Sequence, residues 1–287
     1  MKIAITGAGG FVGKELTRFF SARHKVLALT RHSLDITDGH AVRRIITDAH
    51  PDLIINCAVS GVNDCEANPS MAHAVNVSGP QSLAEAAAEI DAEILHFSTN
   101  YVFDGKREAG SFYTNRDAAL PINAYGESKL AGELAVRTAA PKSYIIRTSW
   151  VFGAGKENNF FGLAARALTE RKRLRAVTDV RASVTYVVDL IARIEEILAL
   201  HHYETYHVVN DGDCSYYEFA LEVAHNLRMS SAEIDSLIEA VTESELQRNA
   251  SRPRHTPMRC LVSEELGLPA LRCWRTALSQ YLDGLRG

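Results

Sequence analysis

The chain has 287 residues, 46% of them hydrophobic, and a formal net charge of −4. This composition supports a sizeable core and excludes a disordered chain. The weak negative charge gives no electrostatic reason to expect nucleic acid or an anionic membrane as a partner.

The five cysteines are widely spaced and form no CxxC pair or Cys/His ligand cluster. This pattern predicts reduced thiols and no metal site. A first strand is predicted from residue 2, which leaves no room for a signal peptide. No apolar run approaches the roughly 18 residues of a membrane span. We therefore expect a cytoplasmic protein without a membrane partner.

Apolar strands and helices are predicted to alternate through the first half of the chain. Strands that are apolar throughout are typical of a parallel sheet covered on both faces. With right-handed crossovers, the pattern predicts an α/β fold built on a Rossmann-type doubly wound parallel sheet. The predicted strands cover residues 2–6, 25–30, 53–56, 93–98 and 143–147. The predicted helices are one ending near Ser21 and those over residues 39–49, 67–90 and 124–138.

The second half of the chain is less regular. A strand at residues 205–209 is predicted to rejoin the sheet, and residues 252–257 form a loop. We expect residues 1–150 to form the sheet domain and residues 151–287 to form mainly a smaller lobe over the strand ends, interleaved with it. The predicted helices cover residues 158–169, 187–200, 216–227, 244–249 and 274–282.

A glycine-rich turn follows the first strand in the pattern Thr6-Gly7-x-x-Gly10-x-x-Gly13. Glycines permit a tight turn and a close backbone approach to a pyrophosphate. Phe11 and Val12 then open a helix, whose N-terminus favours the pyrophosphate charge. The turn predicts a dinucleotide site, with a plain glycine-rich turn as the alternative.

Arg31 follows the second strand, where an acidic residue would hold a ribose 2′-hydroxyl. A basic side chain suits a 2′-phosphate instead, which favours NADPH over NADH. A surface arginine without a ligand is the alternative interpretation.

Tyr125 and Lys129 lie four residues apart at the start of the predicted helix 124–138. Four residues are about one helical turn, so both side chains rise from the same face. A free phenol has a pKa of about 10, and a nearby ammonium lowers that pKa toward the working range. The pair therefore predicts acid/base chemistry on a carbonyl or an alcohol.

The segment His96-Phe97-Ser98-Thr99-Asn100 ends the fourth predicted strand. Ligands bind at the carboxyl ends of strands in open α/β sheets, and a hydroxyl there can hydrogen-bond a substrate carbonyl. Hydroxyl residues are also common in turns. Together with the glycine turn and the Tyr125–Lys129 pair, in this chain order, the segment predicts an oxidoreductase site.

These motifs resemble an extended short-chain dehydrogenase/reductase and, more narrowly, the dTDP-4-dehydrorhamnose reductase family of sugar-nucleotide 4-ketoreductases. The resemblance covers nearly the whole chain. It rests on LDITD (34–38), NCA (56–58), STNYVFDG (98–105), YGESKLAGE (125–133), RTSWVFG (147–153) and Arg252-Pro253.

The resemblance implies a catalytic triad of Thr99, Tyr125 and Lys129, with NADPH as the cofactor and NADH as a second possibility. It also implies a nucleotide-sugar substrate and a homodimer as one possible assembly. The implied cofactor residues are Gly7, Gly10, Phe11, Val12, Gly13, Arg31, Asp35, Ile36, Cys57, Ala58, Val59, Tyr125 and Lys129. The implied substrate residues are Ser60, Val62, Asn100, Tyr101, Phe103, Trp150 and Arg252, with Arg252 at the diphosphate end.

The chain departs from the family pattern at four places, one of which is Arg254-His255-Thr256 in the later part of the usual Arg-Pro-x-Asn-Ser. Asn100 replaces the aspartate of the usual STDYVFDG, and Val59 replaces an aromatic residue. Residues 179–185 replace a segment like DQxGxPT. A nucleotide-sugar epimerase, another extended reductase, and a regulatory subunit like that of methionine adenosyltransferase are the alternative functions.

Overall fold

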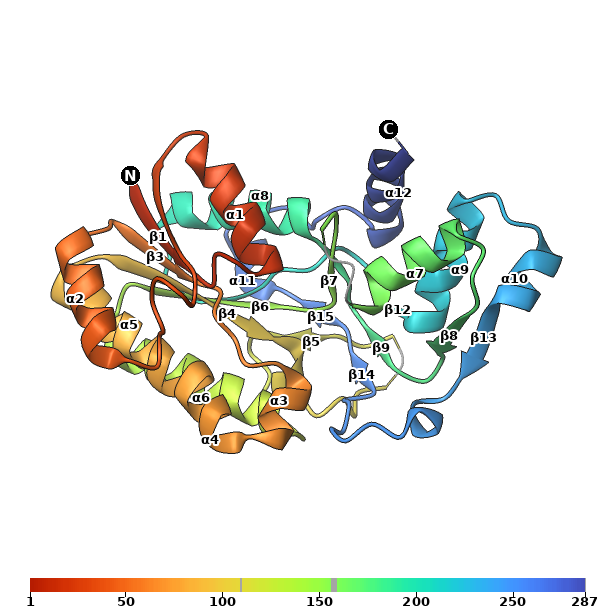
Figure 1. Cartoon of the computed structure of the whole chain (residues 1–287), viewed down its shortest axis with the longest axis horizontal. Helices are drawn as coiled ribbons and strands as arrows, with labels where there is room; N and C mark the ends of the chain where they lie inside the picture. Colours follow the sequence, from red (N-terminus) through yellow and green to blue (C-terminus); the bar gives the residue numbers. More distant parts are fainter. Residues whose placement is uncertain (109, 156–158, 287) are drawn as a thin grey trace.

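The structure is a computed structural model that describes residues 1–108, 110–155 and 159–286. Its centre is a six-stranded parallel sheet with the strand order β11-β6-β4-β3-β1-β2 (Figure 1). The predicted Rossmann-type doubly wound sheet is therefore confirmed. Its strands are β1 Lys2–Thr6, β2 Lys25–Leu29, β3 Leu53–Asn56, β4 Glu93–Thr99, β6 Ser143–Thr148 and β11 Thr205–His207.

The strand order reverses at β1. The chain moves from β1 outward to β2 on one side and then returns to place β3, β4, β6 and β11 on the other side. The connections after β1 and β3 leave in opposite directions, which opens a crevice at their carboxyl ends. The glycine turn follows β1, so the topology places this turn at the crevice.

Helices cover both faces of the sheet, with α1 and α8 above it and α2, α5 and α6 below it in Figure 1. Alternate residues of β1 show why its centre is apolar. Ile3 and Ile5 pack in the core under α1 and α8, whereas Ala4 packs in the opposite core. These helices are α1 Phe11–Ser21, α8 Val187–Leu200, α2 Gly39–Ala49, α5 Gly79–Glu89 and α6 Ala124–Ala139.

The helix predicted over residues 67–90 is confirmed over residues 69–89, but it starts two residues later and contains a π-helical turn. The chain forms α3 Val62–Ala67 and then starts a new helix with α4 Pro69–His73, a π-helical turn over Ala74–Ser78, and α5. Asn68 makes this break because its backbone leaves the helical conformation and its side chain accepts a hydrogen bond from the Met71 N–H. Proline at the first position of α4 fits this start, because its missing N–H has no partner there.

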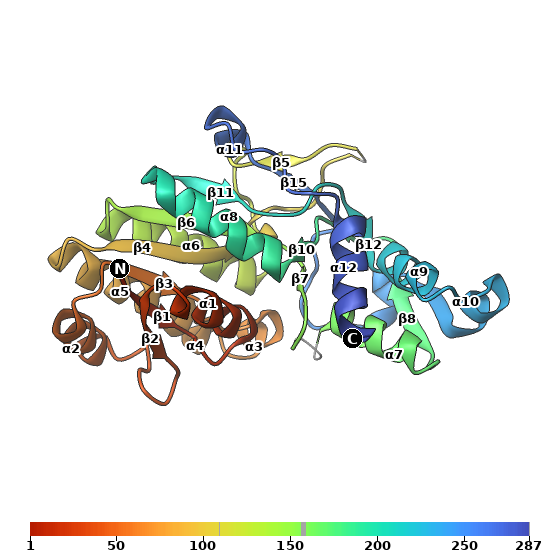
Figure 2. The same cartoon turned by 90° about the horizontal axis from the view of Figure 1, so that it is seen from above.

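Most of the chain after β6, apart from α8 and β11, builds a lobe beside the sheet (Figure 2). Its core contains Phe152, Phe161, Phe219 and Trp274, all buried. The main elements of the lobe are α7 Phe160–Thr169, β8 Leu174–Val177, α9 Tyr216–Asn226, α10 Ser231–Leu237, β13 Ile238–Val241 and α12 Trp274–Arg286. Shorter elements are β5 Tyr113–Thr114, β7 Val151–Phe152, β9 Arg181–Ala182, β10 Thr185–Tyr186, β12 Cys214–Ser215, β14 His255–Thr256, β15 Met258–Arg259 and α11 Leu261–Glu265.

Two helix predictions in this half need comment. The helix predicted over residues 244–249 is wrong, because the chain forms a short 3-10 turn over Glu243–Leu246 and Gln247 then adopts a left-handed backbone conformation. The predicted start of another helix at Asn158 lies outside the described residues. In the described part of the chain, no helix combines the length and the apolar character needed to cross a membrane.

Candidate active site

The glycine turn packs directly against the end of β3. Gly7 has a φ of +64°, and a Cβ atom there would lie 2.6 Å from the Ala58 nitrogen. A Cβ atom on Gly13 would lie 2.3 Å from the Gly7 carbonyl oxygen. Only glycine avoids both conflicts. The turn therefore brings backbone N–H groups and the start of α1, at Phe11 and Val12, to the crevice.

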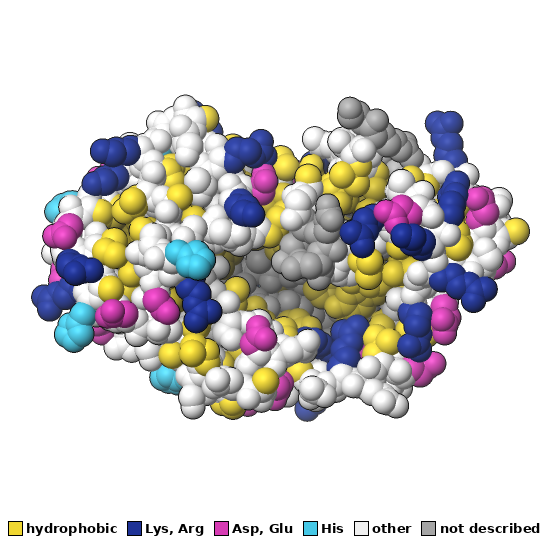
Figure 3. All heavy atoms as spheres, viewed as in Figure 1, with side chains coloured by type: hydrophobic (Ala, Val, Ile, Leu, Met, Phe, Trp, Pro, Cys, Tyr) yellow, Lys and Arg dark blue, Asp and Glu magenta, His cyan; other side chains and the backbone are white. Residues whose placement is uncertain are grey.

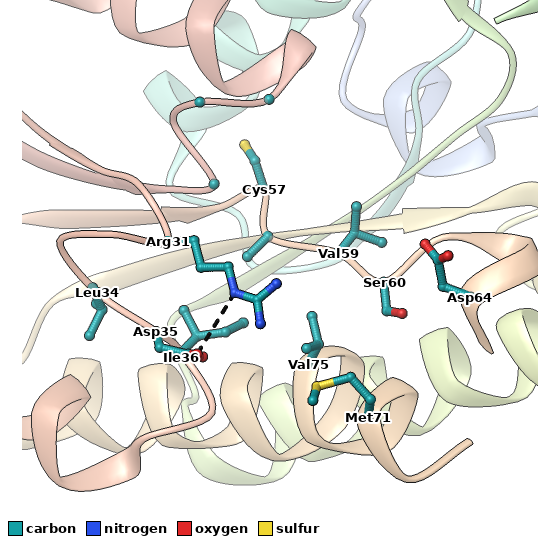
Figure 4. A pocket seen from close by; sticks show the side chains of 14 residues that line it. Arg31, Leu34, Asp35, Ile36, Cys57, Val59, Ser60, Asp64, Met71 and Val75 are labelled. Atoms are coloured by element: carbon teal, nitrogen blue, oxygen red, sulfur yellow. Dashed lines mark ion pairs between the residues drawn. The ribbon is translucent and has the colours of Figure 1, made fainter. Parts of the chain in front are cut away.

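A cavity of about 460 Å³ opens beside this turn (Figure 4). It gathers eight of the predicted cofactor residues, namely Gly7, Gly10, Arg31, Asp35, Ile36, Cys57, Ala58 and Val59. Ser60, which the sequence assigned to the substrate, also lines it. The sequence analysis missed five further lining residues, most of which belong to no motif and line the cavity only because of how the chain folds. They are Gly9, Leu34, Asp64, Met71 and Val75.

The lining of the cavity fits a dinucleotide. Leu34, Ile36 and Val75 offer apolar walls for a flat base, and the glycine turn offers N–H groups for phosphate. Arg31 points across the cavity mouth, with its Nε atom 3.9 Å from Asp35 (Figure 4). The Thr37 N–H and hydroxyl bind the Asp35 carboxylate and hold its pKa below the ordinary value.

Thr99 and Tyr125 meet at the carboxyl end of β4. Thr99 ends the strand, Tyr125 stands in the first turn of α6, and the two side chains are close enough for the Thr99 hydroxyl to act on the phenol. A cap and a close approach of two backbone segments fix the start of α6. The Asn123 side chain accepts a hydrogen bond from the Gly126 N–H, and a Cβ atom on Gly126 would lie only 2.1 Å from the Tyr101 carbonyl oxygen.

Burial raises the pKa of Tyr125, and the Thr99 hydrogen bond only partly opposes this shift. The sequence predicted the opposite direction, on the ground that the Lys129 ammonium would act on the phenol. In the structure, Lys129 Nζ instead donates to the Phe97 carbonyl oxygen at 2.6 Å and lies 3.2 Å from His96 Nε2. Tyr125 is therefore a protonated phenol at neutral pH.

Lys129 is almost completely buried, with 2% of its surface exposed. Burial lowers its pKa to about 8, against the opposing effect of the nearby Glu133 carboxylate. The lysine lies on the same face of α6 as Tyr125. The three residues predicted to be catalytic therefore come together at one strand end.

A group of aromatic and basic side chains lies on the other side of Tyr125. The rings of Tyr101 and Tyr125 meet edge to face, with centroids 5.5 Å apart. Arg252 donates to the Tyr101 hydroxyl at 3.3 Å and to Asn63 Oδ1 at 3.2 Å. Figure 3 shows a depression in the molecular surface between the sheet half and the lobe.

Trp150 joins this side of the site through a partner that the sequence analysis missed. Trp150 has a left-handed backbone conformation, and its ring lies 4.0 Å from that of Tyr216. Tyr216 is the first residue of α9, and no motif marked it. Only the packing of the lobe places the Tyr216 ring against Trp150.

The remaining predicted substrate residues differ in their accessibility. Val62 begins α3 near the cavity. Asn100 is buried, and it donates to Thr256 Oγ1 at 2.7 Å and accepts from Thr99 Oγ1 at 3.2 Å. Phe103 is fully buried and stacks on Tyr113, so it has no surface open to a ligand. Asn100 thus links the carboxyl end of β4 to β14.

Asn76 is a further residue that the sequence analysis missed. Its side chain accepts from the Ser60 N–H at 2.8 Å and donates to Ser128 Oγ at 2.9 Å. It thereby holds the cavity segment after β3 against α6. No motif marks an asparagine inside a π-helical turn. The described residues contain no cluster of three or more His, Cys, Asp or Glu side chains that could hold a metal ion.

Comparison with known proteins gives matches along the whole chain. The family model described as "RmlD substrate binding domain" matches residues 1–286. The dTDP-4-dehydrorhamnose reductase of Mycolicibacterium smegmatis is 37% identical over 292 residues, which covers 100% of this chain and 86% of that protein.

Two solved structures are similar over nearly their full lengths. A dTDP-4-dehydrorhamnose reductase from Clostridium acetobutylicum has a TM-score of 0.92 and 34% identity, with 100% of both chains covered. The same enzyme from Bacillus anthracis, solved in complex with NADP, has a TM-score of 0.92 and 31% identity, with 99% of both chains covered. With these matches and the geometry above, the chain belongs to the RmlD substrate binding domain family, the family of the dTDP-4-dehydrorhamnose reductases.

Proposed function

We propose that this protein uses NADPH to reduce the 4-keto group of a nucleotide-activated 6-deoxy sugar. The observation that carries the proposal is the pairing of Thr99 and Tyr125 at the carboxyl end of β4, beside the cavity at the glycine turn. A proton donor and a nucleotide cavity side by side suit the reduction of a carbonyl. Family membership supplies the sugar-nucleotide class of substrate.

Tyr125 donates its proton to the ketone oxygen. Burial raises the pKa of this phenol, so the proton is present at neutral pH. Thr99 orients the same oxygen through its hydroxyl, which already contacts Tyr125. The reduced nicotinamide supplies the hydride when it is bound. In its charged form, Lys129 stabilises the tyrosinate left after proton transfer.

Arg31 favours NADPH over NADH in this proposal. Its side chain is 79% exposed at the mouth of the cavity and lies across from Asp35. A guanidinium in that position pairs with a ribose 2′-phosphate, which NADH lacks. The cavity segment from Cys57 to Val59 leads from this end toward Tyr125.

The substrate lies between the sheet half and the lobe in this proposal. Tyr101 and Trp150 contact the sugar, and Arg252 binds the diphosphate. Support comes from the contacts that already join these residues, since Arg252 bonds Tyr101 and Tyr101 packs on Tyr125. Ser60 and Val62 extend the same side of the site. Asn100 does not contact the substrate and instead positions Thr99 and Thr256 by hydrogen bonds. Phe103 supports the site by packing in the core.

The test is NADPH oxidation with a panel of dTDP- and UDP-activated 4-keto-6-deoxy sugars, with the reduced sugar identified by NMR. We expect oxidation that is stoichiometric with the formation of one alcohol, and fastest with a dTDP sugar. Absence of oxidation with every sugar of the panel, by a protein that binds NADPH, would overturn the proposal.

The alternative functions give different outcomes in the same experiment. An epimerase would convert the sugar while NADPH is conserved. A regulatory subunit would bind NADPH, oxidise none, and co-purify with a catalytic partner. Another extended reductase would oxidise NADPH with a substrate outside the panel.

A further inference from the structure

A chain of buried polar side chains runs from β3 through β4 to α6. Asn56 Nδ2 lies 3.0 Å from His96 Nδ1, and His96 Nε2 lies 3.2 Å from Lys129 Nζ. All three side chains are at most 2% exposed. The imidazole therefore sits between an amide and the lysine of the proposed site, where every hydrogen must have an acceptor.

The orientation of the Asn56 amide is fixed by its neighbours. Its Oδ1 atom accepts from the Ala58 backbone N–H at 3.1 Å and from Thr6 Oγ1 at 2.7 Å. A backbone N–H can only donate, so the atom that faces it is the oxygen. The Nδ2 atom of Asn56 must then donate to His96.

This direction fixes the hydrogen of the imidazole. Since Nδ1 of His96 accepts from Asn56, the one N–H of a neutral ring lies on Nε2. That N–H points at Lys129 Nζ. If Lys129 were an ammonium, its hydrogens would face the Nε2–H and no bond could form. A neutral amine instead accepts a hydrogen bond from the Nε2–H with its lone pair. The amine keeps an N–H for the Phe97 carbonyl oxygen at 2.6 Å.

We propose that His96 is a positioning residue whose Nε2–H binds the neutral amine of Lys129 and thereby makes the lysine charge easy to lose. The inference deepens the proposed function and rests on it for the role of Lys129 in turnover. His96 thereby sets the upper pH limit of the charged lysine, the form that stabilises the Tyr125 anion.

The surroundings agree with this direction. Burial lowers the pKa of His96 well below its ordinary value, and the charge of Lys129 adds to this effect, so the ring stays neutral. Burial also lowers the pKa of Lys129 to about 8. The other ionisable groups that act on Lys129 are Glu133 on α6, Cys57 after β3 and Cys65 on α3. All three favour the ammonium, so none of them explains the lowered value.

The first test needs no activity. Nitrogen-15 NMR of the histidine-labelled protein distinguishes the two imidazole tautomers, and His96→Gln identifies the signal among the eleven histidines. We expect a neutral His96 with its hydrogen on Nε2 at pH 7. A hydrogen on Nδ1, or an imidazolium, would overturn the inference while leaving the reductase assignment intact.

The second test reverses the hydrogen-bond chain with Asn56→Asp. A carboxylate still accepts from Ala58 and Thr6, but it also accepts from His96 Nδ1. The hydrogen then moves to Nδ1, and Nε2 becomes an acceptor for the ammonium. We expect the NMR signal to change tautomer. We also expect the fall in kcat at alkaline pH to move upward by about one pH unit or more, because the lysine charge is favoured.

His96→Gln gives an independent measurement, since its amide oxygen can accept from the ammonium and should move the alkaline limb in the same direction. His201→Gln is the matched control, because His201 is 64% exposed and pairs with Glu93 at the far end of β4. It should leave the pH profile unchanged. An unchanged alkaline limb in folded Asn56→Asp and His96→Gln would show that His96 only fills space.

Discussion

The sheet half and the lobe after β6 place their functional residues by different means. In the sheet half, the glycine turn and Cys57 follow strands and Thr99 ends one, so parallel strands carry them to one edge. In the lobe, Trp150 and Tyr216 meet through an aromatic core built from short elements. The first arrangement depends on the sheet topology, and the second depends on side-chain packing.

This difference in placement separates the residues proposed for the reaction from the residues proposed for substrate selectivity. Residues proposed for hydride and proton transfer stand on rigid strand ends and on the first turns of α6. Residues proposed to choose the sugar lie where the two halves meet, and the departures from the family pattern at residues 179–185 fall in the lobe. A change in the sheet half should therefore affect the rate, and a change in the lobe should affect stability or substrate binding.

Tyr125→Phe tests the chemistry of the sheet half and should have the largest effect. Loss of the phenolic proton should lower kcat about a thousandfold, as expected for loss of a general acid. NADPH binding, measured by calorimetry, should change little. Tyr203→Phe is the control, because its hydroxyl bonds Glu93 at the start of β4. Full turnover by Tyr125→Phe would refute the assignment of this tyrosine.

Phe219→Ala tests the packing of the lobe. Phe219 is fully buried and contacts the rings of Phe152, Phe161 and Trp274. Its loss should reduce the free energy of unfolding by about 3–5 kcal/mol, measured by urea denaturation. The NADPH affinity of the folded fraction should persist. Leu163→Ala on exposed α7 surface is the control, with an expected change below about 0.5 kcal/mol.

Arg252→Met tests the boundary between the two halves. The variant loses the bond to Tyr101 and the proposed diphosphate contact. The KM for the nucleotide sugar should rise by the factor that corresponds to a loss of about 1.5–3 kcal/mol of binding free energy. The kcat value should fall much less. Arg254→Met removes a 68% exposed side chain two residues away and should leave KM unchanged. Equal effects of the two variants would argue for general electrostatics instead of a specific contact.

Arg31→Ala should have the smallest effect, because this guanidinium is largely exposed. We expect the affinity for NADPH to fall by up to about fivefold, the range of an exposed ion pair. The affinity for NADH should stay constant. Arg43→Ala, which removes an exposed pair with Glu89 on the α2 surface, is the control. A parallel loss for both cofactors would show that Arg31 does not select the 2′-phosphate.

Much of the sheet half was predictable. Apolar runs marked the strands, and the glycine turn and the Tyr125–Lys129 spacing marked candidate site positions after β1 and at the start of α6. The start of the long helix over residues 67–90 was placed two residues too early because its alanine-rich composition concealed the cap at Asn68. The pairing of β8 with β13 was missed because it joins residues about 64 positions apart, beyond the reach of local patterns.

The sequence by itself determined the fold class, the family and the order of the motifs, because periodicity, glycine spacing and short strings are local properties. Only the tertiary structure decided the direction of the Tyr125 pKa, the contact of Lys129 with His96, and the place of Tyr216 beside Trp150. Burial and hydrogen-bond direction depend on residues far apart in the chain, so these properties arise only when β3, β4, α6 and α9 pack together.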